Sequence, residues 1–161
     1  MKRYNSIELL YPPLANKIPQ IQDEFYRKTG TNLVVLESLR TGMRQDYLYS
    51  MGRTLQGSVI TNAQAYQSLH QYGLAVDFIV DISPGIPGVQ GPYSADADYH
   101  YLFELCRDYD LISGASWGDL GHVEVKTDFS VNHLKKILFS SNKYGIQSIF
   151  ESVKMEKEVI I

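Results

Sequence analysis

The sequence predicts a small α+β domain, with helices packed on one face of a largely antiparallel sheet. Two short segments alternate apolar and polar residues, which is the period of a strand with one face in a core. Other segments place apolar residues three or four positions apart, as a helix with one buried face does. The polar positions of the two alternating segments carry histidine and carboxylate side chains, so the exposed face of the sheet is where function is expected.

The first third of the chain predicts a helix, a strand and a second helix. Two prolines introduce the first helix, where a missing backbone N–H costs nothing, and Gly30 ends it. The expected inner face of this helix consists of Leu14, Ile18, Ile21 and Phe25. Residues 32–37 predict a strand, and residues 41–51 predict the second helix. Residues 52–67 lack periodicity and predict a loop.

The rest of the chain alternates between loops and helical segments. Residues 83–92 contain several prolines and glycines and predict a long loop, either a rim of the site or a plain connector. Ser94 or Asp96 can cap a helix that runs to about Asp110. Its expected inner face consists of Tyr99, Leu102, Phe103 and Cys106. Residues 131–153 predict one or two further helices.

The composition indicates a compact protein and excludes some classes. A chain of 161 residues with 44% hydrophobic residues can build one core, so residues 1–161 are expected to form a single domain. The lone Cys106 allows no internal disulfide. A net charge of −3 with scattered basic residues argues against nucleic-acid binding. No signal peptide or membrane span is expected, which predicts synthesis in the cytoplasm and no membrane partner.

Histidine and carboxylate residues recur in two separate segments. In the first, Leu74, Val76, Phe78 and Val80 alternate with polar positions, so Asp77 lies on the open face and His70 comes just before it. In the second, Val123 and Val125 take the apolar face, while His122 and Glu124 share the other. We expect these two strands to present His70, Asp77 and His122 on one face of the sheet. Two imidazoles and one carboxylate leave a fourth position open, as catalytic zinc sites do.

Hydrolysis at zinc also needs a proton carrier outside the ligand set. Asp119 lies three residues before His122 in an expected turn, and it is the candidate. Glu124 is better suited to orienting a ligand imidazole or pairing with Lys126 than to binding the metal, since such histidines nearly always need a partner for their second nitrogen.

These residues resemble a known family. The runs Ser68-x-His70-x-x-Gly73-x-Ala75-x-Asp77 and Asp119-x-x-His122-x-Glu124 are similar to zinc peptidases of the D-Ala-D-Ala carboxypeptidase type, closest to the phage L-alanyl-D-glutamate endopeptidase branch. The upstream run from Arg40 to Thr54 strengthens the resemblance, which covers about residues 13–126 as a catalytic core. A helical segment of about residues 129–153 follows. The chain differs between Trp117 and His122, where it is shorter and has Gly121 in place of an expected proline.

The resemblance implies a hedgehog/D-Ala-D-Ala peptidase-like fold and a zinc metallopeptidase acting on the peptidoglycan stem peptide. The expected bond joins L-alanine and D-glutamate. By correspondence, His70, Asp77 and His122 bind Zn²⁺, Asp119 is the catalytic acid/base, Arg40 faces the substrate, and Ser68 lies beside the scissile peptide. A D-Ala-D-Ala carboxypeptidase would use the same four central residues. A zinc-stabilised binding module without catalysis is a third reading, against which the presence of Asp119 and Ser68 argues.

The resemblance also implies where the protein works. An enzyme of this branch acts on the cell wall, either as an endolysin after release or as part of a virion. Phage tail or virion proteins are therefore expected partners in the second case, because tethering supplies local concentration without a wall-binding segment.

Overall fold

The computed structural model describes residues 2–81, 99–140 and 145–159. Its centre is a four-stranded sheet in the order β1-β2-β4-β3, and each pair of neighbours is antiparallel. The predicted α+β class is confirmed. The strands and helices are listed in chain order: α1 (Pro12–Thr29), β1 (Asn32–Glu37), α2 (Gly42–Ser50), β2 (Ala75–Asp81), α3 (Tyr99–Asp108), β3 (Leu111–Ser113), β4 (His122–Val125), α4 (Val131–Ser140) and α5 (Gly145–Val159). Short 3-10 helices are η1 (Ile7–Leu9), η2 (Leu69–Tyr72) and η3 (Gly114–Trp117).

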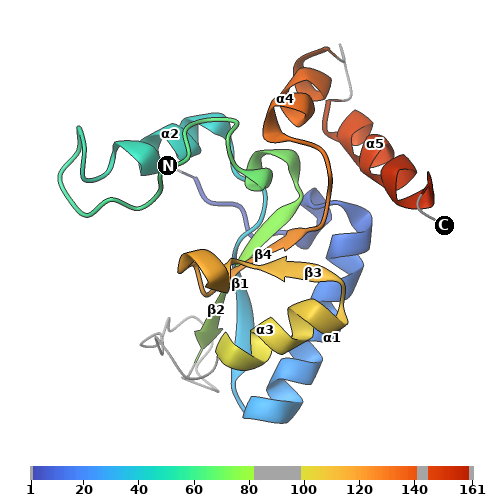
Figure 1. Ribbon diagram of the computed structural model, residues 1–161. Coiled ribbons are helices and arrows are strands. Elements are labelled where there is room, and N and C mark those ends of the chain that lie inside the picture. The colour runs from blue at the N-terminus through green and yellow to red at the C-terminus, as the bar shows by residue number, and fades with distance from the viewer. Residues whose placement is uncertain (1, 82–98, 141–144, 160–161) are drawn as a thin grey trace.

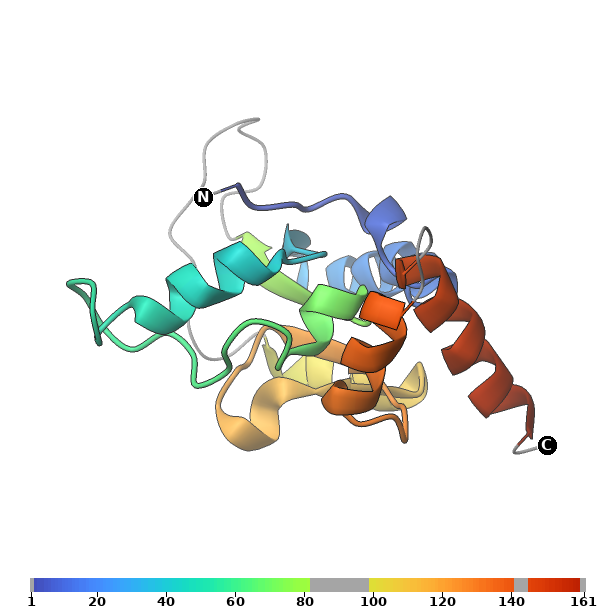
Figure 2. The same ribbon diagram turned by 90° about the horizontal axis from the view of Figure 1, so that it is seen from above.

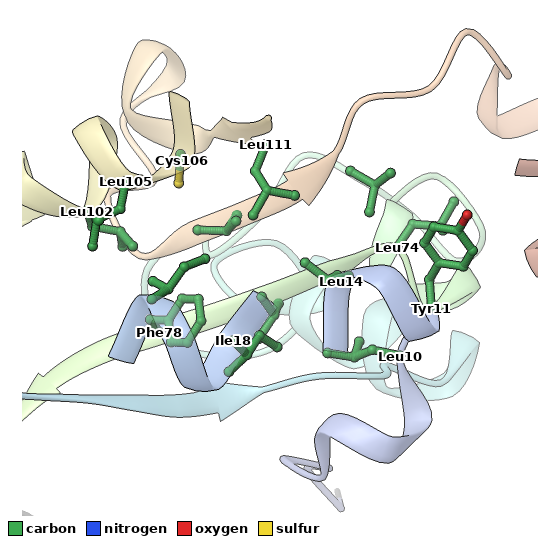
Figure 3. Close-up of a cluster of buried hydrophobic side chains, with 14 of the residues drawn as sticks. Leu10, Tyr11, Leu14, Ile18, Leu74, Phe78, Leu102, Leu105, Cys106 and Leu111 are labelled. Atoms are coloured by element: carbon green, nitrogen blue, oxygen red, sulfur yellow. The ribbon is translucent and has the colours of Figure 1, made fainter. Parts of the chain in front are cut away.

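Helices α1 and α3 cover the apolar face of the sheet (Figures 1 and 3). All four residues predicted for the inner face of the first helix are buried, and α1 ends at Gly30, whose φ of 73° is left-handed and suits glycine. Phe78 and Leu74 of the central strand region meet α1 and α3 in one cluster (Figure 3). This cluster is the core, and it leaves the opposite face of the sheet for polar residues.

The inner face of α3 differs from the prediction at one position. Leu105 is buried with Tyr99, Leu102 and Cys106, while Phe103 is only half-buried at the edge of the core. At about 100° per residue, Leu105 and Phe103 lie on opposite edges of the face centred on Leu102 and Cys106, and the structure buries the Leu105 edge while Phe103 packs at the margin of the core. The predicted start of this helix at residue 94 or 96, and the predicted loop of residues 83–92, lie outside the described residues.

The C-terminal segment forms two helices, one of the two predicted outcomes. Helices α4 and α5 pack against each other at one end of the molecule (Figures 1 and 2). Phe150 of α5 lies 5.5 Å from Tyr11 between ring centroids, which joins this pair to the start of α1. In the described part of the chain, no helix has both the length and the apolar character that crossing a membrane requires.

Candidate metal centre

Three side chains from distant parts of the sequence converge on one point. Nε2 of His70 and Nδ1 of His122 each lie 3.0 Å from Oδ1 of Asp77. The two ring nitrogens are 3.3 Å apart, and all three candidate ligand atoms lie within 4.8 Å of one another. The structure therefore brings together the three residues that the sequence predicted as zinc ligands.

The sheet positions two of these residues directly. Asp77 of β2 pairs with His122 of β4, and residues directly opposite in an antiparallel pair project from the same face. His70 lies in η2 instead, so the expectation that strands present all three residues was wrong for this histidine. Ser68 caps η2 by accepting from the His70 backbone N–H, and Gly73 ends it with a left-handed φ of 69°, which turns the chain into β2.

Hydrogen bonds orient both imidazole rings. Nδ1 of His70 lies 2.8 Å from the Ser38 carbonyl oxygen, which can only accept, so Nδ1 carries a hydrogen and Nε2 is the nitrogen that faces Asp77. Nε2 of His122 lies 2.9 Å from Oε2 of Glu124, which leaves Nδ1 to point at Asp77. Each ring therefore turns one nitrogen toward the convergence point and is braced through the other, as metal-binding histidines usually are.

The charges of the site favour an ionised carboxylate. Burial by itself would raise the pKa of Asp77, but the charge of His70, hydrogen bonds from His122 and His70, and the charge of Arg40 together hold it well below its usual range. Burial likewise opposes a charged His122, but hydrogen bonds to Asp77 and Glu124 raise its pKa to about 9. Asp77 is thus available as an anionic ligand, whereas His122 must lose a proton before it can bind a metal.

The convergence point lies in a cleft of about 460 Å³. Its lining includes the three convergent residues and Arg40, Ser68, Trp117, Asp119, Glu124, Phe129 and Val131. The Trp117 ring is 5.8 Å from the His122 ring between centroids, although more than half of this side chain is exposed. An exposed aromatic ring beside the convergence point gives the cleft an apolar rim suited to contact with a bound molecule.

Asp119 lies in this cleft, in the turn between η3 and β4. Its backbone N–H donates to the Gly114 carbonyl at 3.0 Å, and its carbonyl accepts from the His122 N–H at 3.2 Å. Although the residue as a whole is exposed, loss of water around its carboxyl group raises its pKa, and the negative charge of Asp77 raises it further. Asp119 is therefore near the convergent residues and has the raised pKa that proton transfer near neutral pH favours.

Gly121 explains how this turn departs from the family pattern. A Cβ atom at this position would lie 2.2 Å from the Phe78 carbonyl oxygen, and the Gly121 carbonyl accepts from the Phe78 N–H at 2.8 Å. Proline carries a Cβ, so the expected proline does not fit here. The close approach of the turn to β2 delivers His122 to its place opposite Asp77.

Arg40 lines the cleft, but each of its side-chain nitrogens donates a hydrogen bond to another residue of the protein. Nε donates to Oε2 of Glu37 at 3.0 Å, Nη1 to Oε1 of Gln45 at 3.1 Å, and Nη2 to Oδ2 of Asp77 at 2.6 Å. Its predicted contact with substrate stays a prediction. Ser68 also lines the cleft, with its hydroxyl engaged as the cap of η2.

Sequence reasoning missed two buried residues beside the site, Glu37 and Arg44. Both are more than nine-tenths buried and form an ion pair, although charged residues are rarely buried in proteins. A glutamate at the end of an otherwise apolar strand, three residues before Arg40, was the available signal. Trp117 was also noted in its motif without a role.

One comparison with a known protein agrees with the family resemblance seen in the motifs. No protein-family model matches the chain. It is 30% identical over 103 residues to the peptidoglycan L-alanyl-D-glutamate endopeptidase CwlK of Bacillus subtilis (strain 168), an alignment that covers 60% of this chain and 62% of that protein. The chain thus spans less than two thirds of the length of this relative. The resemblance to the endopeptidase branch is confirmed by this similarity.

A solved structure is also similar. The crystal structure of the Serratia marcescens L-Ala D-Glu endopeptidase ChiX matches with a TM-score of 0.49 and 18% sequence identity, covering 78% of this chain and 90% of that one.

Proposed function

We propose that this protein is a zinc-dependent peptidoglycan peptidase that hydrolyses the L-alanyl-D-glutamate bond of the stem peptide. The observation that carries the proposal is the convergence of His70, Asp77 and His122 in a cleft that also holds Asp119. Similarity to a protein named as an L-alanyl-D-glutamate endopeptidase supports the choice of bond.

The residues present fit a zinc ion by donor type and number. Imidazole nitrogen and carboxylate oxygen are common zinc ligands, and a set of three leaves one position open, as in catalytic rather than structural sites. Both imidazoles are oriented through their second nitrogen, and the neighbours of Asp77 lower its pKa, which favours the anionic form that binds metal. Zinc held by these three side chains would polarise the scissile carbonyl and make water more acidic.

Asp119 is the proposed proton carrier. Its ionised carboxylate would take a proton from the attacking water and pass it to the departing amine, which requires a pKa closer to neutral than that of an ordinary aspartate. Its surroundings shift the pKa in that direction. Glu124 is the alternative carrier. Its carboxylate, however, is hydrogen-bonded to Nε2 of His122, whereas Asp77 lies at Nδ1 on the other side of the ring. This position supports a bracing role for Glu124.

Arg40 and Ser68 are proposed to serve the substrate. The Arg40 guanidinium is only about one-tenth exposed, and it adds positive charge to the wall of a cleft that would receive an anionic stem peptide. Ser68 would lie beside the scissile peptide. Cleft shape decides between an endopeptidase and a D-Ala-D-Ala carboxypeptidase, because the central residues are the same.

The test is digestion of purified peptidoglycan by the metal-loaded protein, followed by mass spectrometry of the fragments. A new free amine on D-glutamate is expected. Release of single D-alanine residues would instead assign carboxypeptidase activity, and unchanged peptidoglycan would contradict both. The same digestion after chelation, and again after zinc is restored, shows whether the metal is required.

We further propose that the protein meets its substrate outside the cytoplasm, after release from the cell as an endolysin or as part of a virion with phage tail proteins. Electron microscopy of particles with a labelled antibody distinguishes the two. Label on intact particles is expected for the virion form, and particles without label are expected for the released form.

A further inference from the structure

An irregularity in β1 places a second carboxylate opposite Asp77. The β1–β2 register runs through the pair Val35 and Phe78 and resumes at Glu37 and Asp77, with a β-bulge between them. Without the extra residue, Leu36 would lie opposite Asp77. The bulge therefore brings Glu37 onto the face that carries the metal site, as bulges beside active sites often do.

Arg40 bridges these two carboxylates. Its Nη2 donates to Oδ2 of Asp77 at 2.6 Å and lies 2.9 Å from Oε2 of Glu37, while its Nε donates to the same Glu37 oxygen at 3.0 Å. The other oxygen of Asp77, Oδ1, faces both histidines. One oxygen of Asp77 is thus directed to the metal position and the other is held by Arg40.

Two further residues, Arg44 and Gln45, hold the side chains of Glu37 and Arg40 in place. Arg44 forms an ion pair with Glu37, whose side chain is only 4% exposed. Gln45 is fully buried, accepts from Nη1 of Arg40, and donates to the Ala63 carbonyl at 2.7 Å. Glu37 and Arg40 are therefore anchored on several sides. The two arginines also balance the charges of the two carboxylates, which a buried cluster requires.

We propose that Glu37 is a positioning residue for the metal ligand Asp77 and acts through Arg40. Its carboxylate fixes the guanidinium, which in turn binds Oδ2 of Asp77 and keeps Oδ1 directed at the metal. The inference rests on the proposed function, because it assumes that Asp77 binds zinc. Partners of this kind, one step removed from the metal, typically change metal affinity by about tenfold to a hundredfold when they are removed.

The experiment compares the zinc affinity of wild type and Glu37→Gln by competition with a chelator. The expected result is a loss of about tenfold to a hundredfold in Glu37→Gln. Glu104→Gln removes the same charge from the exposed surface of α3 and is expected to keep wild-type affinity. Ile18→Val trims a buried residue of α1, on the other face of the sheet, and shows whether a small loss of stability alone changes zinc affinity.

A second variant separates positioning from simple charge balance. Glu37→Gln with Arg44→Met removes the ion pair and leaves Arg40 and Asp77 as the remaining pair, so this protein can fold even if the single variant does not. If Glu37 positions Asp77, zinc affinity stays about tenfold or more below wild type in the double variant. Wild-type affinity in either variant overturns the inference. Absence of zinc binding by the wild type would be a failure of the proposed function, seen before any variant is compared.

Discussion

The two faces of β2 are built in opposite ways. On one face, Val76, Phe78 and Val80 are buried among apolar residues of α1 and α3. On the other, Asp77 is held by Arg40, His70 and His122. The first face gains its stability from burial of apolar surface, which has no direction. The second depends on hydrogen bonds with defined geometry and on matched charges.

Mutations on the two faces should therefore impair different properties, stability on the apolar face and metal binding on the polar face. A smaller side chain in the core leaves a cavity and lowers the free energy of unfolding, but it leaves the polar face intact. Removal of one group from the polar face leaves its partners misdirected or unpaired, so the proposed metal binding should be lost first. The apolar face supplies the fold, and the polar face supplies the site.

The largest expected effect is on the polar face. His70→Ala and His122→Ala should each abolish zinc retention and peptidase activity, because two of the original three ligands do not hold the ion. Elemental analysis after gel filtration measures retention, and circular dichroism checks that the variants are folded. His100→Ala, on the exposed side of α3, is the matched control and should retain zinc. Full zinc occupancy in both site variants would contradict the ligand assignment.

A mutation in the apolar core should lower stability and leave zinc binding intact, the reverse of the histidine variants. Phe25 is fully buried, so Phe25→Ala should lower the free energy of unfolding of the metal-free protein by about 3–5 kcal/mol. Chemical denaturation measures this loss. Tyr26→Ala changes the exposed neighbour and should stay within about 0.5 kcal/mol of wild type. While folded, Phe25→Ala should still bind one zinc per chain, and loss of zinc from the folded variant would show that the two faces are coupled.

The sequence predicted the elements of the apolar face well because burial leaves a periodic signal. The α1 face and the strand β1 agree with the predicted residues, and the strand around Asp77 alternates as expected. The strand β3 was missed because three residues are too few to show a period. Phe103 packs against the core but is only half-buried, which the sequence did not predict because the three-to-four spacing does not decide which edge of a helical face is covered.

The polar face was only partly predictable. The spacing of His70, Asp77 and His122 pointed to one site, and the structure brings these residues together. The ion pair of Glu37 and Arg44 was not visible, because a bulge in β1 decides which residue lies opposite Asp77. A bulge follows from three-dimensional strand pairing, so the position of Glu37 at the end of an apolar strand was the one local signal and it did not identify the residue opposite Asp77. The three side-chain hydrogen bonds of Arg40 could not be predicted from the sequence for the same reason.

Asp119→Asn tests the polar face without removing a ligand. The variant should retain one zinc per chain and lose activity by about a hundredfold or more, the range expected for general acid/base catalysis. Because the pKa of Asp119 is raised in the fold, its carboxyl group stabilises the protein below its ordinary pKa and this contribution is lost as pH rises. At neutral pH the metal-free variant should therefore be at least as stable as wild type.

Glu124→Gln is the companion variant. If Glu124 braces His122, this change should weaken zinc binding by about tenfold to a hundredfold, and excess zinc should restore much of the activity. If Glu124 is instead the proton carrier, Glu124→Gln will be inactive at full zinc occupancy while Asp119→Asn remains nearly as active as wild type. Wall-lysis rates, each paired with metal content, decide between the two assignments.

The change expected per pH unit is the smallest of these effects, and it has opposite signs for the metal-free and the metal-loaded protein. In the metal-free protein, the pKa of His122 is raised to about 9. Its protonated form therefore stabilises the fold fully below the unfolded value of about 6.5, and this contribution is lost as pH rises toward 9. Zinc must displace the same proton, so zinc affinity should rise by about tenfold per pH unit in this range. Raising the pH should thus weaken the metal-free fold while strengthening zinc binding.

Chemical denaturation of the metal-free protein and chelator competition, both at matched pH values, measure how the free energy of unfolding and the zinc affinity change with pH. In His122→Gln, the His122 contribution to the pH dependence of unfolding should be absent. Zinc affinity that does not change between pH 6.5 and 9 would show that His122 binds without releasing a proton.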